Sequence, residues 1–183
     1  MTPEIKTDKP SLLLRLLKED DAEELSLRVD QNRDHLRQWM PWLDEIDTLN
    51  FIRSSLESAT AGTQYSYALL LGSELVGAVA FNSIEKMNRC ATMGYWLAKS
   101  KMGNGYMTAA VKALIEEGFQ QLELNRIQAR VATGNYPSQA VCERLGLKKE
   151  GVLRQAEWLY DHYVDLVMNS VLRSEWKAQS DRK

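Results

Sequence analysis

Seven short apolar or alternating runs along the chain have the pattern of β-strands. In one of them Ile127, Ala129 and Val131 alternate with polar residues, as on a half-buried strand. The predicted strands cover residues 11–17, 65–71, 75–81, 89–98, 127–131, 147–154 and 163–172. Short connections predict antiparallel neighbours between residues 65 and 98. A helical crossover precedes 127–131, which is therefore predicted to run parallel to 89–98.

Between these runs, apolar residues recur at three- and four-residue spacing, which predicts amphipathic helices. One helix is expected to start at Asp20, with Glu23 completing a capping box. A second helical region starts near residue 34, is interrupted at 39–42 and resumes over 48–58. The longest predicted helix follows a short glycine loop, and its apolar stripe is formed by Met107, Val111, Leu114, Ile115 and Leu122. A last helix lies within 134–147.

These elements predict one domain over residues 1–183, with a polar tail from about residue 174. A chain of this length with 44% hydrophobic residues is large enough for one real core. No internal repeat or linker divides it. The predicted fold class is α/β (α+β mixed), with a mixed, mostly antiparallel sheet flanked by helices.

The loop with Gly103 and Gly105, between a strand and the longest helix, is a candidate anion site. Glycines let a ligand approach the backbone, and a helix N-terminus attracts a phosphate. A plain tight connection explains the same residues equally well. The next residues exclude a P-loop, since Tyr106 and Met107 follow Gly105, and Thr108 replaces the third glycine of a dinucleotide fingerprint.

Charge and composition narrow the functional classes. A formal net charge of −2 gives no field that favours nucleic acid or an acidic membrane. The two cysteines, Cys90 and Cys142, are far apart, and His35 and His162 are the only histidines, so neither a metal site nor a disulfide framework is expected. No apolar run suits a signal peptide or a membrane span. We expect a cytoplasmic enzyme or binding module.

Trp39 and Trp42 flank a proline and have two interpretations. They either fill a gap between helices or form the wall of a substrate cavity. In the second case the nearby carboxylates of Asp44, Glu45 and Asp47 would attract a cationic amine, although such carboxylates are often only a solvated surface.

Nearly the whole chain resembles the GNAT superfamily of N-acetyltransferases, and within it the RimJ/RimL type that acetylates ribosomal-protein N-termini. The segments that carry the resemblance are 13–21, 93–97, 102–108, 135–154 and 155–159. The resemblance implies a sheet splayed between the strands at 89–98 and 127–131, with acetyl-CoA held in the cleft and no metal. It also implies a homodimer or higher homo-oligomer.

The resemblance further implies which residues bind acetyl-CoA. The backbone of Trp96, Leu97 and Ala98 would bind the pantetheine and acetyl groups, and Asn135 the pantetheine arm. Pyrophosphate would be held by Gly103, Asn104, Gly105, Tyr106, Met107 and Thr108. Two residues depart from the usual pattern: Met102 replaces Gln or Arg, and Met107 replaces a small residue. Because neither binds pyrophosphate through its side chain, we expect binding to be retained.

Acetyl transfer from a thioester needs a neutral amine, and an α-amino group has a pKa of about 7.7–8.0, so a general base helps at neutral pH. The leaving thiol has a pKa of about 8.5, so a hydroxyl suffices as the acid. A backbone N–H would stabilise the oxyanion. Direct attack requires no covalent enzyme intermediate.

The tyrosine that many members use as the acid is matched here by Cys142, which we interpret as a packed small residue. RimL-like enzymes are thought to use a serine acid and a glutamate base, and these match Ser138 and Glu157. The alternatives are a first-turn capping role for Ser138 and a solvated loop position for Glu157.

The leading hypothesis is therefore an N-acetyltransferase that acts on the N-terminal α-amine of a protein, ribosomal by resemblance, with Trp39 and Trp42 as substrate-binding residues. One alternative is acetylation of a small molecule such as a polyamine or an aminoglycoside-like amine. Another is an acetyl-CoA-binding sensor without catalysis. Turnover distinguishes the sensor from the enzymes, and a preference for peptides over diamines distinguishes the two enzymes.

Overall fold

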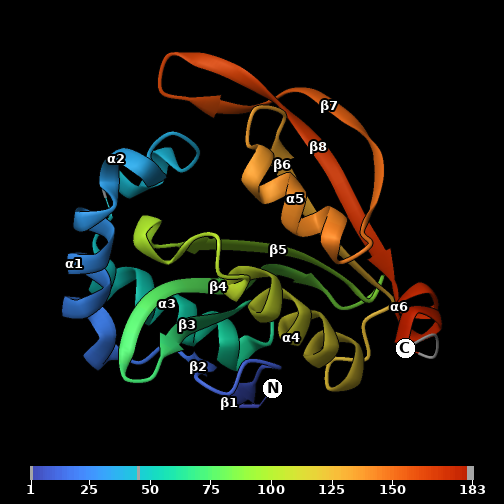
Figure 1. The fold of residues 1–183 in the computed structure, drawn as a ribbon, viewed down its shortest axis with the longest axis horizontal. Coiled ribbons are helices and arrows are strands. Elements are labelled where there is room, and N and C mark those ends of the chain that lie inside the picture. The colour runs from blue at the N-terminus through green and yellow to red at the C-terminus, as the bar shows by residue number, and fades with distance from the viewer. Residues whose placement is uncertain (1, 45, 181–183) are drawn as a thin grey trace.

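A computed structural model describes residues 2–44 and 46–180. It contains one eight-stranded sheet with the order β1-β2-β3-β4-β5-β6-β8-β7 (Figure 1). The strands are β1 (Glu4–Lys6), β2 (Leu12–Leu16), β3 (Tyr65–Leu71), β4 (Glu74–Glu85), β5 (Cys90–Leu97), β6 (Arg126–Ala132), β7 (Lys148–Leu159) and β8 (His162–Leu172). All neighbours are antiparallel except β5 and β6, which are parallel as the crossover predicted. The expected mixed, mostly antiparallel sheet is therefore confirmed.

Three strands differ from the prediction. β1 has only three residues and was not predicted. β4 continues to Glu85 instead of ending at residue 81, and its pairing with β5 shifts between Phe81 and Ser83, so that Asn82 is left out of the register. β7 continues to Leu159 through a second irregularity between Leu153 and Glu157. Such bulges depend on the partner strand, so the local sequence pattern does not reveal them.

The helices follow the predicted segments, with differences at their ends. They are α1 (Ala22–Gln31), α2 (Arg33–Leu36), α3 (Thr48–Ala61), α4 (Tyr106–Gln120), α5 (Tyr136–Arg144) and α6 (Arg173–Ser180). The polar segment from about residue 174 is thus helical, because Trp176 packs its ring 6.4 Å from that of Phe119 and anchors α6. The predicted stripe residue Leu122 lies just beyond the end of α4.

The start of α1 also differs from the expected capping box of Asp20 and Glu23. The N-cap of α1 is Asp21, whose side chain makes no cap hydrogen bond to α1. Its carboxylate instead accepts a hydrogen bond from the Lys18 backbone N–H at 2.8 Å, at the start of the short 3-10 helix Glu19–Asp21 that leads into α1. The same carboxylate is bonded to the Arg15 guanidinium at 2.6 Å. Burial alone would raise the pKa of Asp21, but the bonds from Arg15 and Lys18 outweigh it and lower the pKa.

Two hydrophobic cores lie on opposite faces of the sheet. α4 packs on one face in a core that includes Phe81, Leu114 and Ile127. α1 and α3 cover the other face with a smaller core around Leu25, Ile52 and Trp96 (Figure 1). Successive residues of a strand point to opposite faces, so β5 contributes side chains to both cores. Residues 95 and 96 consequently lie on different sides of the sheet.

The sheet opens between β5 and β6. Their pairing runs from Cys90 opposite Arg126 to Met93 opposite Ala129, although β5 continues to Leu97 and β6 to Ala132. The last residues of the two strands therefore diverge, as the expected splay requires. In the part of the chain that the structure describes, no helix is both long and apolar enough to cross a membrane.

Candidate active site

A cavity of about 1100 Å³ occupies the opening between β5 and β6. It extends from the glycine loop before α4, past the N-terminus of α5, to α2 and β7. Most of the candidate residues from the sequence line it: Trp39, Trp96, Leu97, Gly103, Gly105, Tyr106, Met107, Thr108, Asn135, Ser138 and Glu157. Ala98, Asn104 and Trp42 do not line it.

The open edge of β5 offers main-chain groups to a ligand. Ala98 is already bonded, because its N–H donates to the Val76 carbonyl at 2.8 Å and its carbonyl accepts from Lys101 at 2.9 Å. Main-chain groups of successive residues in an antiparallel pair point alternately toward and away from the partner strand. Those of Tyr95 and Leu97 therefore face the cavity, so Leu97 is the best placed of the three residues expected to bind through their backbone.

The glycine loop has the geometry of an anion site. Gly103 and Gly105 have φ angles of 78° and 73°, which a residue with a side chain adopts only with strain. Gly105 is the N-cap of α4, and no side chain caps the helix, so its first N–H groups are available to a phosphate. Asn104 instead holds the loop, donating from Nδ2 to the carbonyls of Lys101 and Met102.

Lys9 adds a positive charge to this loop and was not among the site residues expected from the sequence. It belongs to the connection between β1 and β2, and its Nζ lies 5.6 Å from the centre of the Tyr106 ring. The same atom would lie 3.8 Å from a Cβ placed on Gly105. Among the described residues Lys9 has no ion-pair partner, whereas the neighbouring Lys112 is paired with Asp8 at 3.2 Å. Only the fold brings these distant segments together.

Ser138 lies at the N-terminus of α5, but its hydroxyl does not cap that helix. The cap is Asn135, whose Oδ1 accepts from the Ser138 backbone N–H at 3.2 Å. The Ser138 hydroxyl lies 2.9 Å from Oη of Tyr95, which reaches it from β5. The capping interpretation of Ser138 is therefore wrong, and its hydroxyl is positioned by a tyrosine that the sequence analysis did not single out.

Tyr95 joins three groups on α5. Its Oη also donates to the Ser138 carbonyl at 3.1 Å and lies 3.6 Å from Sγ of Cys142. Burial raises the pKa of Tyr95 far above its usual value, so the hydroxyl stays protonated. Burial also raises the pKa of the Cys142 thiol. Cys142 is 1% exposed and packs as a small apolar residue, as expected.

Glu157 lies in β7 at the edge of the cavity, not in a solvated loop. Its carboxylate is partly buried, and this loss of water contact raises its pKa. No hydrogen-bond donor contacts it among the described residues. His35 from α2 lines the same cavity, and burial, followed by the charge of Lys99, lowers its pKa. His35 was not among the site residues expected from the sequence.

The two tryptophans separate in the structure. Trp39 lines the cavity next to the turn before α5, where a Cβ on Gly134 would approach the Trp39 ring to 3.2 Å. Trp42 is 46% exposed and stacks on Phe51, with ring centres 5.9 Å apart. It lines a second cavity on the α1 and α3 side of the sheet.

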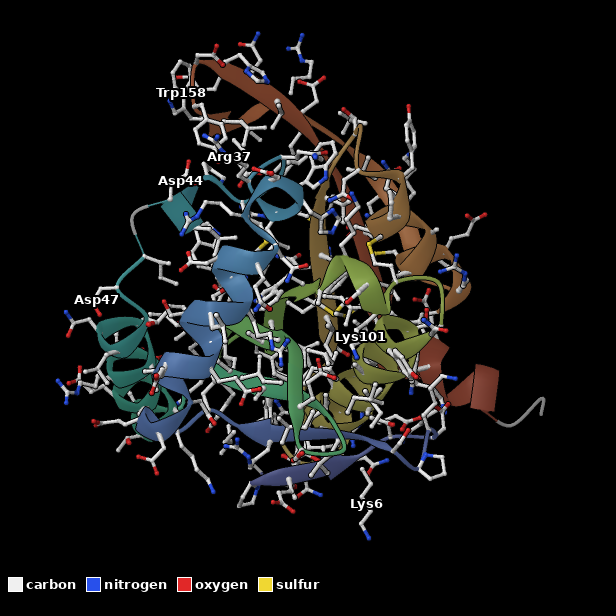
Figure 2. All side chains as sticks on the ribbon, turned by 60° about the vertical axis from the view of Figure 1, so that its left-hand side comes forward. Lys6, Arg37, Asp44, Asp47, Lys101 and Trp158 are labelled. Atoms are coloured by element: carbon white, nitrogen blue, oxygen red, sulfur yellow. The ribbon has the colours of Figure 1, made fainter. Side chains whose placement is uncertain are left out.

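The acidic residues near these tryptophans do not form an unpaired negative surface. Asp44 is bonded to Arg33 at 3.2 Å and to Arg37 at 3.0 Å. Asp47 caps α3 by accepting from the Asn50 backbone N–H at 3.0 Å. Glu45 lies outside the described residues. Figure 2 shows Asp44 beside Arg37 and Asp47 pointing away from them. The expectation that these carboxylates attract a cationic amine is therefore not supported by Asp44 or Asp47.

The site thus has a loop with the geometry of an anion site at one end and a hydroxyl and a carboxyl toward the other. This arrangement suits an elongated ligand with phosphates at one end and a reacting group at the other. Among the described residues no cluster of His, Cys, Asp and Glu has the arrangement of a metal site.

Comparison with known proteins agrees with this geometry. The acetyltransferase (GNAT) domain family matches residues 11–148. YdaF of Bacillus subtilis (strain 168) is 34% identical over 176 residues, which cover 92% of this chain and 94% of YdaF. The ribosomal-protein-serine acetyltransferase of Escherichia coli (strain K12) is 33% identical over 170 residues, covering 91% and 94% of the two chains.

Solved structures are similar over the same extent. RimL, a ribosomal L7/L12 α-N-protein acetyltransferase in complex with coenzyme A, superposes with a TM-score of 0.89 at 27% identity, covering 92% of this chain and 97% of RimL. The microcin C7 self-immunity acetyltransferase MccE, in complex with acetyl-CoA and AMP, has a TM-score of 0.85 at 28% identity and covers 88% and 92%. The chain therefore belongs to the GNAT acetyltransferases and is an acetyl-CoA-dependent N-acetyltransferase of the RimJ/RimL-like type.

Proposed function

We propose that the acceptor is the N-terminal α-amine of a protein, most simply a ribosomal protein. The observation that carries this proposal is one cavity holding a carboxyl with a raised pKa, Glu157, and a hydroxyl held by a buried tyrosine, Ser138. Relatives that span nearly the whole chain are named for acetylating ribosomal proteins. A ribosomal acceptor is also the basis for inferring a cytoplasmic location.

A polyamine or an aminoglycoside-like amine is less well matched to this site. Recognition of a polycation needs several unpaired carboxylates, because each ammonium loses hydration on binding. Asp44 is shared by two arginines and Asp47 caps a helix. Among the described residues, Glu157 is then the carboxylate that lines the amine end of the cavity, and one carboxylate suits one amine.

The end of the cavity at the glycine loop is assigned to acetyl-CoA, the acetyl donor. The N–H groups of Gly103, Gly105, Tyr106, Met107 and Thr108 would hold the pyrophosphate, with the Lys9 ammonium beside it. Leu97 would bind the pantetheine through its backbone, together with the Asn135 amide nitrogen, which the capping bond leaves available. Asn104 supports the loop instead of the ligand.

Transfer proceeds by direct attack of the amine nitrogen on the thioester carbonyl. A C–N bond forms and the C–S bond breaks. Glu157 takes the proton that the amine loses, directly or through a water molecule, and its raised pKa makes the carboxylate a better base than an exposed glutamate. A backbone N–H at the open edge of β5 stabilises the oxyanion.

Ser138 gives a proton to the departing sulfur and takes one back from water, while Glu157 releases the proton from the amine to water, so that both side chains return to their starting forms. The hydroxyl of Tyr95 is within hydrogen-bond distance of Ser138 Oγ, and both hydroxyls can rotate, so Tyr95 can donate to Ser138 while Ser138 donates to sulfur. Tyr95 stays protonated in this scheme, because burial raises its pKa far above neutral. We therefore assign Tyr95 as a positioning residue.

Release of the CoA thiol from acetyl-CoA tests the proposal. The acceptors are peptides that differ at their N-termini, spermidine and an aminoglycoside, with a reaction lacking acceptor as the control. We expect release with peptides. Faster release with spermidine or the aminoglycoside would favour a small-molecule enzyme, and acetyl-CoA binding without release would favour a sensor.

We further propose that residues 1–183 work as one catalytic domain and that the protein self-associates. The edge strand β7 and its hairpin with β8 expose aromatic residues that suit a protein contact, including Trp158 and Tyr163, which are 52% and 58% exposed. Light scattering of the purified protein gives the oligomeric state, and a monomer at all concentrations would contradict the second proposal.

A further inference from the structure

A second cavity, of about 410 Å³, lies on the α1 and α3 side of the sheet and meets the catalytic cavity. The residues lining both cavities are Met40, Asn82, Gly94, Tyr95 and Trp96. β5 presents a different side chain to each face of the sheet: Tyr95 contacts Ser138 on one face, and Trp96 belongs to the core on the other. The second cavity therefore opens on the opposite side of β5 from the hydroxyl assigned to the departing sulfur.

The walls of this cavity are mostly apolar and partly exposed; the polar residues that line it are Asn82 and the pair Gln64 and Ser66, which are hydrogen-bonded to each other at 3.2 Å. Trp42 stacks on Phe51 at one side, and Val29 and Leu43 lie in the core that lines it. The Asp44 carboxylate next to these residues is paired with two arginines, so it does not neutralise a bound ammonium. The cavity suits an apolar group of the size of a leucine or phenylalanine side chain and excludes a charged one.

One polar group stands where the two cavities meet. Asn82 lies at the irregularity of β4, outside the register with β5, and its side chain is exposed. No hydrogen bond of its carboxamide is found among the described residues. It lies across Gly94, where an added Cβ would approach Nδ2 to 2.4 Å. An unpaired carboxamide here can bond a peptide group next to the reacting amine.

We infer that this second cavity binds the side chain of the acceptor's first residue and selects peptides in which that side chain is large and apolar. The inference rests on the proposed N-terminal acetylation. A relative is named for acetylating serine, a small polar residue. For this chain the cavity favours a different first residue of the acceptor: leucine, methionine or phenylalanine rather than serine or alanine.

Binding without turnover gives the first test. The CoA-bound protein is titrated by calorimetry with leucinamide, phenylalaninamide and serinamide, which present the same amine and amide. We expect the two apolar compounds to bind at least roughly tenfold more tightly than serinamide, since each buried methylene contributes about that much to discrimination. Equal affinities, or tighter binding of serinamide, would overturn the inference whether or not any peptide is acetylated.

A filled cavity gives the second test. Ala80 lines only the second cavity, beside Gly94 on β5, so Ala80→Leu fills it and leaves the catalytic cavity unchanged. Ser83→Leu is the matched control, because Ser83 is an exposed residue of the same strand that lines neither cavity.

We expect Ala80→Leu to lower kcat/KM roughly tenfold for a peptide beginning with leucine and to leave a serine peptide unchanged, while Ser83→Leu changes neither. Retained activity on the serine peptide shows that the variant is folded. An equal effect of Ala80→Leu on both peptides overturns the inference and leaves the proposed N-terminal acetylation intact. Absence of CoA release with every peptide overturns the proposed function, and the titration then decides the inference alone.

Discussion

Two glutamates of β7 show how position sets the acidity of a side chain. Hydrogen bonds from Arg126 and Ser170 lower the pKa of Glu150 to about 2. Glu157 has no such partner, and burial raises its pKa. Because a base works best when its pKa is near the working pH, Glu157 suits proton abstraction and Glu150 does not. Glu150 instead joins β7 to β6 through its bond to Arg126 at 2.6 Å.

Replacing Glu157 tests the assigned base. Only the carboxylate accepts a proton, so kcat/KM is expected to rise with pH through a pKa above the ordinary glutamate value and to be lost as pH falls below it. Glu157→Gln should lower kcat roughly 10²-fold and remove this rise in kcat/KM (the acid limb of the profile). The rise that comes from deprotonation of the acceptor amine should remain. The measurement is a pH profile of CoA release.

Two further variants make this result specific. Glu143→Gln removes an exposed carboxylate of α5 outside the cavity and should leave the profile unchanged. His35→Asn tests the imidazole that lines the same cavity and whose pKa is lowered by burial. Loss of the acid limb in His35→Asn, with a normal profile in Glu157→Gln, would transfer the role of base to His35.

Ser138→Ala tests the assigned acid. It should lower kcat roughly 10²-fold with natural acetyl-CoA, and the loss should shrink when the donor is a thioester of a more acidic thiol, which leaves without a proton. Tyr95→Phe should show a smaller loss with the same dependence on the donor, since it only orients Ser138. A loss in Ser138→Ala that is equal for all donors would show that the serine is structural.

At the scale of elements, local chemistry made part of the site predictable. The glycine loop, the proline in the first turn of α5 and the parallel crossover from β5 to β6 all follow from residues adjacent in sequence. The bulges that expose Asn82 and place Glu157 depend on the register with neighbouring strands. Lys9 and Tyr95 reach the site from other elements, so sequence spacing gave no signal for them.

Lys9 provides a test of the anion-binding loop. Lys9→Met should raise the KM for acetyl-CoA roughly tenfold, because a hydrogen bond to a charged group contributes about 1.5 kcal/mol. The KM for acetyl-pantetheine, which carries no phosphate, should not change. Lys6→Met is the matched control, since Lys6 on β1 points away from the molecule (Figure 2). An equal rise with both donors would contradict a phosphate contact.

In the whole molecule, the catalytic cavity lies where β5 and β6 diverge. Beyond the open ends of these strands, the segment after α2 contacts the β7–β8 hairpin. The Arg37 guanidinium lies 5.0 Å from the centre of the Tyr160 ring, and Arg37 is also paired with Asp44. Figure 1 shows the hairpin extending from the sheet toward α2. In Figure 2 Arg37 lies near Trp158 of the hairpin. Arg37 and Tyr160 do not line the cavity themselves, but their contact joins two segments that do, at Leu36 and at Glu157.

Loss of the contact between Arg37 and Tyr160 should weaken binding of the acceptor peptide and not binding of acetyl-CoA. Arg37→Ala is expected to raise the KM for a peptide roughly threefold, consistent with a cation–π contact of about 0.5–1 kcal/mol at an exposed site. The KM for acetyl-CoA should stay constant. Arg53→Ala removes an exposed arginine paired with Glu19, outside both cavities, and serves as the control. An unchanged peptide KM in Arg37→Ala would show that this contact does not shape the acceptor site.

The acetyl group is assigned to an N-terminal α-amine. The most direct measurement uses a peptide that carries both a free N-terminus and a lysine, incubated with acetyl-CoA and the protein and then sequenced by tandem mass spectrometry. We predict the acetyl group on the α-amine and an unmodified lysine. Acetylation of the lysine side chain, or of neither amine while spermidine is acetylated, would contradict an α-amine acceptor.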